Sequence, residues 1–138
     1  MREKFHIDIK FTVFGRPVSQ KNSKRVGFKK GGKGFLWTPQ NIKEWKSRAV
    51  EQISQQWGGQ DPIPSGVEME AEIISFLGKG QSIDSDNLAS GPLDAMQQAG
   101  VYKNDYWVKR ITSDRMKDHE NPRVTIHLKN YEEKHQES

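Results

Sequence analysis

Hydrophobic and polar residues alternate in several stretches of the chain, and this period of two is typical of strands that bury one face. The first stretch covers residues 7–14, where four hydrophobic side chains share a face. The same alternation covers residues 67–77 and 123–131, and residues 107–116 form a further stretch with a basic face. We therefore expect four strands. The three glutamates on the polar side of 67–77 would repel one another and point to solvent, away from a polyanion.

Two other stretches carry hydrophobic residues at helical spacing. Residues 39–57 form the longer one, with a Thr-Pro pair before it and a Gly-Gly pair after it, which are ordinary start and stop signals. Residues 88–99 form the shorter one. Pro92 cannot donate a backbone hydrogen bond to Leu88, so this helix should either start late, with Ser90 as N-cap, or kink.

Between the first strand and the first helix, V-G-F and F-L-W are predicted to pair as a ribbon. The order strand, hairpin, helix, strand, helix, strand, strand indicates an α+β protein, a two-layer sandwich in which a mixed β-sheet carries two main helices on one face. A length of 138 residues suits a single domain over residues 1–138. The hydrophobic content of 33% and the mean hydropathy of -0.90 are low. We therefore expect a partner subunit to cover some apolar surface.

Composition excludes several classes of protein. The chain has no Cys, which removes disulfides, thiolate catalysis and Cys-bound metals. No stretch approaches the roughly 20 apolar residues of a membrane span, and the N-terminus has no signal-peptide core, so we expect a cytoplasmic protein with no membrane partner. The four His residues show no ligand spacing.

Charge is distributed unevenly along the chain. Residues 9–43 contain nine basic residues and no acidic one, which leaves 13 of the 22 basic residues against all 18 acidic ones elsewhere. Such a basic segment suits a polyanion, although a solvated surface is the alternative. Aromatic residues between the basic ones could stack on bases, but we interpret them mainly as structural. The candidate DNA-binding residues are Lys21, Asn22, Lys24, Arg25, Lys29, Lys30, Lys33 and, further along, Lys79.

The candidate chemistry lies in residues 82–105. Asp84 and Asp86 flank one residue, so in extended or turning backbone their carboxylates can leave the same face and share a cation. A helix and a Gly cap follow, and the chain is expected to return Asp105 to the first pair. Three oxygen ligands suit Mg²⁺, or Mn²⁺, better than zinc. One alternative is that either Asp serves as a helix N-cap. An EF-hand does not fit, because its sixth and twelfth positions would both be Ala.

The motifs D-S-D-N-L, L-D-A-M, A-G and N-D between Asp84 and Asp105 resemble the D-x-D-N-L, D-A-L and D-D signature of the RusA family of Holliday junction resolvases. The resemblance implies a homodimeric, Mg²⁺-dependent endonuclease that resolves four-way branched DNA by paired symmetric incisions in recombination and repair. It implies Asp84, Asp86 and Asp105 as catalytic metal ligands. Alternatives are a nuclease with another branched substrate, such as flaps or forks, and a junction-binding protein with impaired catalysis.

One position departs from the family pattern. Ser90 stands where the family usually carries a Lys, which could place an ammonium near the charge that develops on phosphate. We expect Lys103 to substitute as a catalytic cation because it neighbours the returning Asp105, with Lys79 as the alternative. Asp94, which the family also carries, together with Asn87 and Ser90 is expected to support the ligands from outside the coordination sphere.

Overall fold

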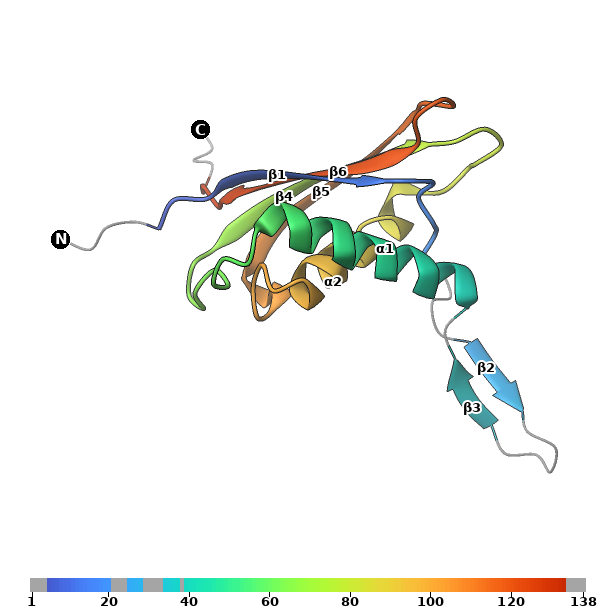
Figure 1. The fold of residues 1–138 in the computed structure, drawn as a ribbon, viewed down its shortest axis with the longest axis horizontal. Helices are drawn as coiled ribbons and strands as arrows, with labels where there is room; N and C mark the ends of the chain where they lie inside the picture. The colour runs from blue at the N-terminus through green and yellow to red at the C-terminus, as the bar shows by residue number, and fades with distance from the viewer. Residues whose placement is uncertain (1–4, 21–24, 29–33, 38, 134–138) are drawn as a thin grey trace, which may run out of the picture.

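The computed structural model describes residues 5–20, 25–28, 34–37 and 39–133 (Figure 1). Within those residues, no helix has the length and apolar character needed to cross a membrane. The elements are β1 (Asp8–Phe14), β2 (Arg25–Phe28), β3 (Gly34–Trp37), α1 (Gln40–Trp57), β4 (Met69–Leu77), the 3₁₀ turn η1 (Ser85–Asn87), α2 (Ser90–Gln98), the 3₁₀ turn η2 (Asp105–Trp107), β5 (Val108–Lys117) and β6 (Arg123–Asn130).

Four strands form one mixed sheet in the order β1-β6-β4-β5. The pairs β1–β6 and β6–β4 are antiparallel, whereas β4 and β5 are parallel. Helices α1 and α2 lie side by side on one face of this sheet (Figure 1). The predicted α+β class, mixed sheet and two helices are confirmed.

The core lies between this sheet face and the two helices. All five hydrophobic residues at helical spacing in α1 are buried, and four of them, all except Ile42, belong to one core cluster with residues of β1, β4 and β6. The helix ends where Gly58 adopts φ 72°, a left-handed conformation in which its N–H bonds to the carbonyl of Ser54. Tyr102 is 1% exposed in this layer, and its hydroxyl donates to the carbonyl of Leu93 at 2.7 Å.

Helix α2 starts late, as Pro92 predicted, but not with the predicted cap. Its first residue is Ser90, and Ala89 occupies the N-cap position without a side-chain hydrogen bond. Pro92 is thus the third helical residue, where the backbone lacks an intrahelical acceptor and a missing N–H costs nothing. The expectation that Ser90 caps the helix is wrong.

The predicted ribbon is present as β2 and β3, which pair antiparallel with Val26 opposite Leu36. In Figure 1 it stands apart from the four-stranded sheet, beyond the start of α1. The side chain of Arg25 lies outside what the structure describes. Most of the other candidate DNA-binding residues lie outside the described residues altogether: Lys21, Asn22, Lys24, Lys29, Lys30 and Lys33.

Each glutamate of the outer sheet face has a basic partner on a neighbouring strand, which offsets the repulsion expected between the glutamates. Lys129 donates to Glu72 at 2.8 Å, and this hydrogen bond holds the pKa of that carboxyl below its usual range. The other pairs are Lys109 with Glu68 at 2.9 Å and Arg110 with Glu70 at 3.8 Å. The outer face is therefore a surface of paired charges.

The buried Tyr102 hydroxyl provides a test of this core. We expect Tyr102→Phe to lower the free energy of unfolding by about 1–3 kcal/mol, because the carbonyl of Leu93 would stay buried without its donor. Urea denaturation measures the change. Tyr106→Phe is the matched control, since Tyr106 is 73% exposed and should change stability by less than about 0.5 kcal/mol. Equal effects of the two substitutions would contradict this account.

Candidate active site

The first two aspartates lie in a turn beyond the carboxyl end of β4. Asp84 has extended backbone immediately before η1, and Asp86 lies within it. Asp84 occupies the N-cap position of this short turn, but its side chain makes no capping hydrogen bond. Its carboxylate is 78% exposed. Asp84 therefore does not cap the turn, and the side chains of Asp84 and Asp86 are both exposed to a ligand from solvent.

Strand β5 holds this turn by two side chains. Ser113 Oγ donates to the carbonyl of Ser85 at 2.6 Å, and Arg115 Nη1 donates to the carbonyl of Ile83 at 2.8 Å. The same Arg115 nitrogen lies 3.4 Å from Asp84 Oδ1. In the part of the chain that the structure describes, Arg115 is therefore the basic residue that lies beside Asp84. Sequence reasoning missed it because Arg115 is 31 residues from Asp84 and only the strand pairing brings the two together.

The base of the basic segment is attached to the same turn. Gln20 N donates to the carbonyl of Asn87 at 2.8 Å. The Gln20 side chain also covers Gly91 in the first turn of α2, where an added Cβ would meet Gln20 Nε2 at 2.8 Å and the Trp45 ring at 3.0 Å. Asn87, predicted to support the ligands, thus contributes its backbone to the junction between the acidic turn and the basic segment.

The third aspartate lies beside the other end of α2. The backbone N–H of Asp105 donates to Gln97 Oε1 at 3.2 Å, next to the last turn of the helix. Burial raises the pKa of the Tyr102 hydroxyl well above its usual range, and the charges of Asp105 and Asp94 add to that effect. Asp105 therefore sits near Tyr102 and the end of α2.

The distance of Asp105 from Asp84 and Asp86 can be estimated along two paths through the chain. Nine helical residues of α2 separate the two ends by about 13 Å. Along β5, the strand runs from Val108, just after η2, to Ser113, which touches η1, a span of about 16 Å. In agreement, the part of the chain that the structure describes contains no group of three or more His, Asp or Glu side chains placed to hold a metal ion. Within one chain the structure does not bring Asp105 to Asp84 and Asp86, and the assignment of all three as metal ligands stays a prediction.

The remaining predicted site residues also lie at separate places in the structure. Asp94 forms an ion pair with Lys46 of α1 at 2.5 Å and accepts from Gln98 at 3.2 Å, so it joins the two helices. Lys103 is exposed and follows the end of α2 next to Asp105, so within one chain it does not neighbour Asp84. Lys79 is exposed in the loop after β4, where its carbonyl accepts from Arg16 at 3.2 Å.

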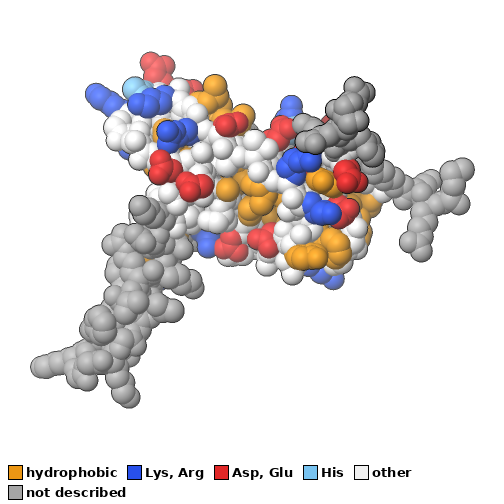
Figure 2. Space-filling model, turned by 180° about the vertical axis from the view of Figure 1, so that it is seen from behind, with side chains coloured by type: hydrophobic (Ala, Val, Ile, Leu, Met, Phe, Trp, Pro, Cys, Tyr) orange, Lys and Arg blue, Asp and Glu red, His pale blue; other side chains and the backbone are white. Residues whose placement is uncertain are grey.

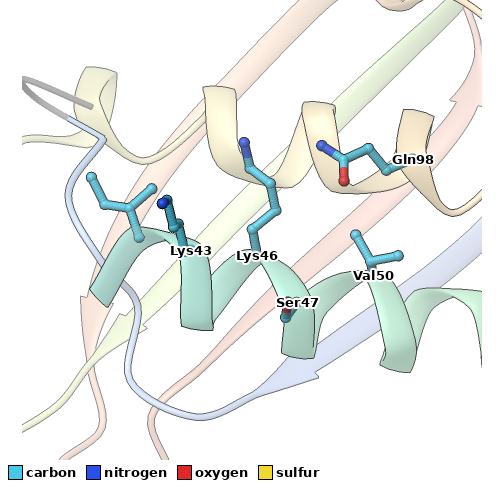
Figure 3. Close-up of a pocket in the computed structure, with 6 residues that line it drawn as sticks. Lys43, Lys46, Ser47, Val50 and Gln98 are labelled. Atoms are coloured by element: carbon cyan, nitrogen blue, oxygen red, sulfur yellow. The ribbon is translucent and has the colours of Figure 1, made fainter. Parts of the chain in front are cut away.

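A surface hollow lies between α1 and α2 (Figure 3), and Asp84, Asp86 and Asp105 are not among the residues that line it. Lys43, Lys46 and Gln98 border it together with apolar side chains, and no carboxylate lines it. Lys46 is already paired with Asp94. The hollow thus offers no metal-binding chemistry.

The donor set at η1 partly fits a hard divalent cation. Carboxylate oxygens are the ligands Mg²⁺ prefers, and it usually keeps several waters, so one or two protein carboxylates can be enough to hold it. Asp84 and Asp86 supply such a pair on an exposed turn, at the carboxyl end of a strand where open α/β sheets commonly bind ligands. Asp105 of the same chain does not complete the set.

An exposed acidic turn after a strand, bonded to Gln20 in the basic segment of residues 9–43, defines a small α+β domain suited to a metal-assisted reaction on a polyanion. The family model for endodeoxyribonuclease RusA matches residues 15–129, so the chain belongs to the RusA family. It is 36% identical over 76 residues to a crossover junction endodeoxyribonuclease RusA of Aquifex aeolicus (strain VF5). This alignment covers 55% of the chain and 56% of that relative, a little over half of each.

The close contact at Gly91 yields a prediction. We expect Gly91→Ala to lower the free energy of unfolding by about 1 kcal/mol, because displacing the Trp45 ring and the Gln20 amide outweighs the helix propensity that Ala gains over Gly. Thermal or urea unfolding measures it. Ser90→Ala, at the preceding exposed helical position, should stay within about 0.5 kcal/mol. A neutral Gly91→Ala variant would show that Gln20 is not held there.

Proposed function

We propose that this protein is a Mg²⁺-dependent endonuclease that resolves four-way DNA junctions by paired symmetric incisions in recombination and repair. The observation that carries the proposal is the exposed Asp84–Asp86 turn, held by β5 and bonded through Asn87 to the base of the basic segment, in a chain of the RusA family. A polyanion bound by the basic segment is thereby brought to the carboxylates.

The aspartates of the turn and the neighbouring Arg115 have different proposed roles. Asp84 and Asp86 bind the divalent ion, and the metal, when bound, lowers the pKa of an attacking water and stabilises the charge on the scissile phosphate. Arg115 lies beside Asp84, where its guanidinium can pair with a phosphate oxygen that approaches the turn. Arg115 is thus a candidate for the charge that the family Lys would supply at Ser90, and Lys103 is the second candidate.

The substrate is tested with a panel of synthetic DNAs. Four-way junctions, forks, flaps and linear duplexes of the same sequence are incubated with the purified protein, with and without Mg²⁺ or Mn²⁺. Symmetric, ligatable nicks in the four-way junction alone support the proposal. Preferred cleavage of forks or flaps would identify a nuclease of another branched substrate. Tight junction binding without cleavage in either metal would identify a binding protein.

Mutations of the carboxylates should impair cleavage without impairing DNA binding. We expect Asp84→Asn and Asp86→Asn each to reduce junction cleavage by more than about 10²-fold while junction binding persists. Removing a partner outside the coordination sphere already costs about 10–100-fold, and these residues are proposed ligands. Cleavage assays and gel-shift titrations on the same junction measure the two effects. Asp61→Asn, an exposed carboxylate in the loop after α1, is the control. Near wild-type cleavage by both variants would refute the site.

Binding should depend on the basic segment instead. We expect neutralising Lys21, Lys24 and Arg25 together to weaken junction binding and to reduce the slope of log Kd against log salt by up to about three units, one for each phosphate contact. Fluorescence anisotropy over a range of salt concentrations measures both. An equal loss of charge at Arg48, Lys109 and Lys129 is the control. An unchanged slope would mean that the segment does not contact phosphate.

A further inference from the structure

The loop that carries the acidic turn is not held by the hydrophobic core. Gly78 and Leu88 are buried, but no residue of the stretch 79–87 between them is. Viewed from behind, the end of the sheet where β4 and β5 finish shows acidic and basic side chains at the surface (Figure 2). The position of the turn therefore depends on hydrogen bonds from neighbouring segments, because burial contributes little to it.

One of those neighbours is the segment of residues 15–20, which leads from β1 toward the ribbon. Its start is fixed, because Gln52 and Gln56 of α1 bond the N–H and carbonyl groups of Phe14 and Thr12 at 2.7–3.3 Å. The following N–H, at Gly15, donates to the carbonyl of the residue before β6 at 3.1 Å. The segment is thus attached at one end, and its other end continues into the basic residues proposed to bind DNA.

From this start the segment follows the loop and bonds to it. Arg16 Nη2 donates to the carbonyl of Lys79 at 3.2 Å. Further along, the N–H of Gln20 donates to the carbonyl of Asn87 at 2.8 Å. These two contacts lie before and after the aspartate pair in the sequence of the loop. The segment therefore holds the loop on both sides of the carboxylates.

Gln81 makes a third contact between the loop and the segment. Its Oε1 accepts from the N–H of Gly78 at 2.8 Å, and its Nε2 donates to the carbonyl of Pro17 at 2.7 Å. One amide group thus uses its acceptor to close the start of the loop and its donor to attach the loop to the segment. Because Gln81 lies three residues before Asp84, a shift of the segment is transmitted to the turn.

We propose that Gln81 is a positioning residue that couples the two binding steps of this nuclease. DNA held by the basic segment orders the loop through Pro17 and Gln81, and the aspartate pair then binds a divalent cation more tightly. Ordering the loop costs conformational entropy, and the ligand that binds first reduces that cost for the second. By linkage, the cation raises the affinity for DNA by the same factor. This inference rests on the proposed function, because it assigns the regulation of that site.

A direct contact between the cation and a DNA phosphate also links the two binding steps. That contribution does not pass through Gln81, so it persists when Gln81 is replaced. The part that Gln81 carries is one hydrogen bond between loop and segment, which corresponds to a change in affinity of about 2–10-fold. The quantity to compare between variant and wild type is therefore the ratio of the DNA affinities with and without the cation.

Fluorescence anisotropy of a labelled four-way junction measures this ratio in Ca²⁺, which takes oxygen ligands as Mg²⁺ does. Gln81→Met keeps a side chain of similar length but removes the amide. We expect it to lower the ratio about 2–10-fold, while DNA affinity without cation and Ca²⁺ affinity without DNA, measured by calorimetry, stay within about twofold of wild type. Gln55→Met, the same change at an exposed position of α1, is the control.

Cleavage kinetics provide a second readout. With saturating junction, Gln81→Met should need about 2–10-fold more Mg²⁺ for half-maximal cleavage and reach the wild-type rate at saturating Mg²⁺. An unchanged affinity ratio, or a lower saturated rate with an unchanged Mg²⁺ requirement, would overturn the coupling. An equal loss of Ca²⁺ affinity with and without DNA would overturn it too, because Gln81 would then be a structural support.

A second variant tests the coupling independently of Gln81. Arg16→Lys keeps the positive charge but removes the guanidinium that donates to the carbonyl of Lys79, so it should lower the same ratio. Thermal unfolding confirms that each variant is folded.

The wild-type protein separates failure of the coupling from failure of the proposed function. If wild type cleaves junctions with Mg²⁺ while both variants keep its affinity ratio and its Mg²⁺ requirement, the coupling is refuted and the nuclease stands. If wild type binds no divalent cation and cleaves no junction, the proposed function is refuted and the coupling with it.

Discussion

The parallel pairing of β4 and β5 is the constraint on which the rest of this structure depends. Parallel neighbours cannot be joined by a tight turn, so the chain must leave the end of β4, cross one face of the sheet and re-enter at the start of β5. Helix α2 makes that crossing. The residues before and after it are consequently held apart along β5, with the Asp84–Asp86 turn beside Ser113 and Arg115 and with Asp105 before Val108.

This constraint also explains what could be predicted from the sequence. Local periodicity and turn residues were enough for β1, α1, β4 and β6, and Pro92 indicated the late start of α2. Strand direction is a non-local property, and nothing in residues 107–116 distinguishes a parallel from an antiparallel partner. The motif therefore identified the acidic residues. It did not predict that they lie before and after the crossover helix, or that Arg115 contacts Asp84.

The acidic turn is stabilised by its neighbours more than by its own short helix. Ser113 and Arg115 bond two carbonyls on one side of it, and Gln20 bonds a third on the other. Because β5 and the base of the basic segment both hold the same few residues, a displacement of either is transmitted to the carboxylates. In a protein that bends or opens a junction, this would couple DNA engagement to the geometry of the site.

The side-chain cover on the β1 edge has a consequence for assembly. A sheet with two open edges can add copies at both ends, and growth of that kind produces fibres. Gln52 and Gln56 of α1 bond the outward backbone groups of Phe14 and Thr12, so a further strand cannot pair with this part of β1 without displacing them. The same two glutamines that attach α1 to β1 therefore prevent growth of the four-stranded sheet at this edge.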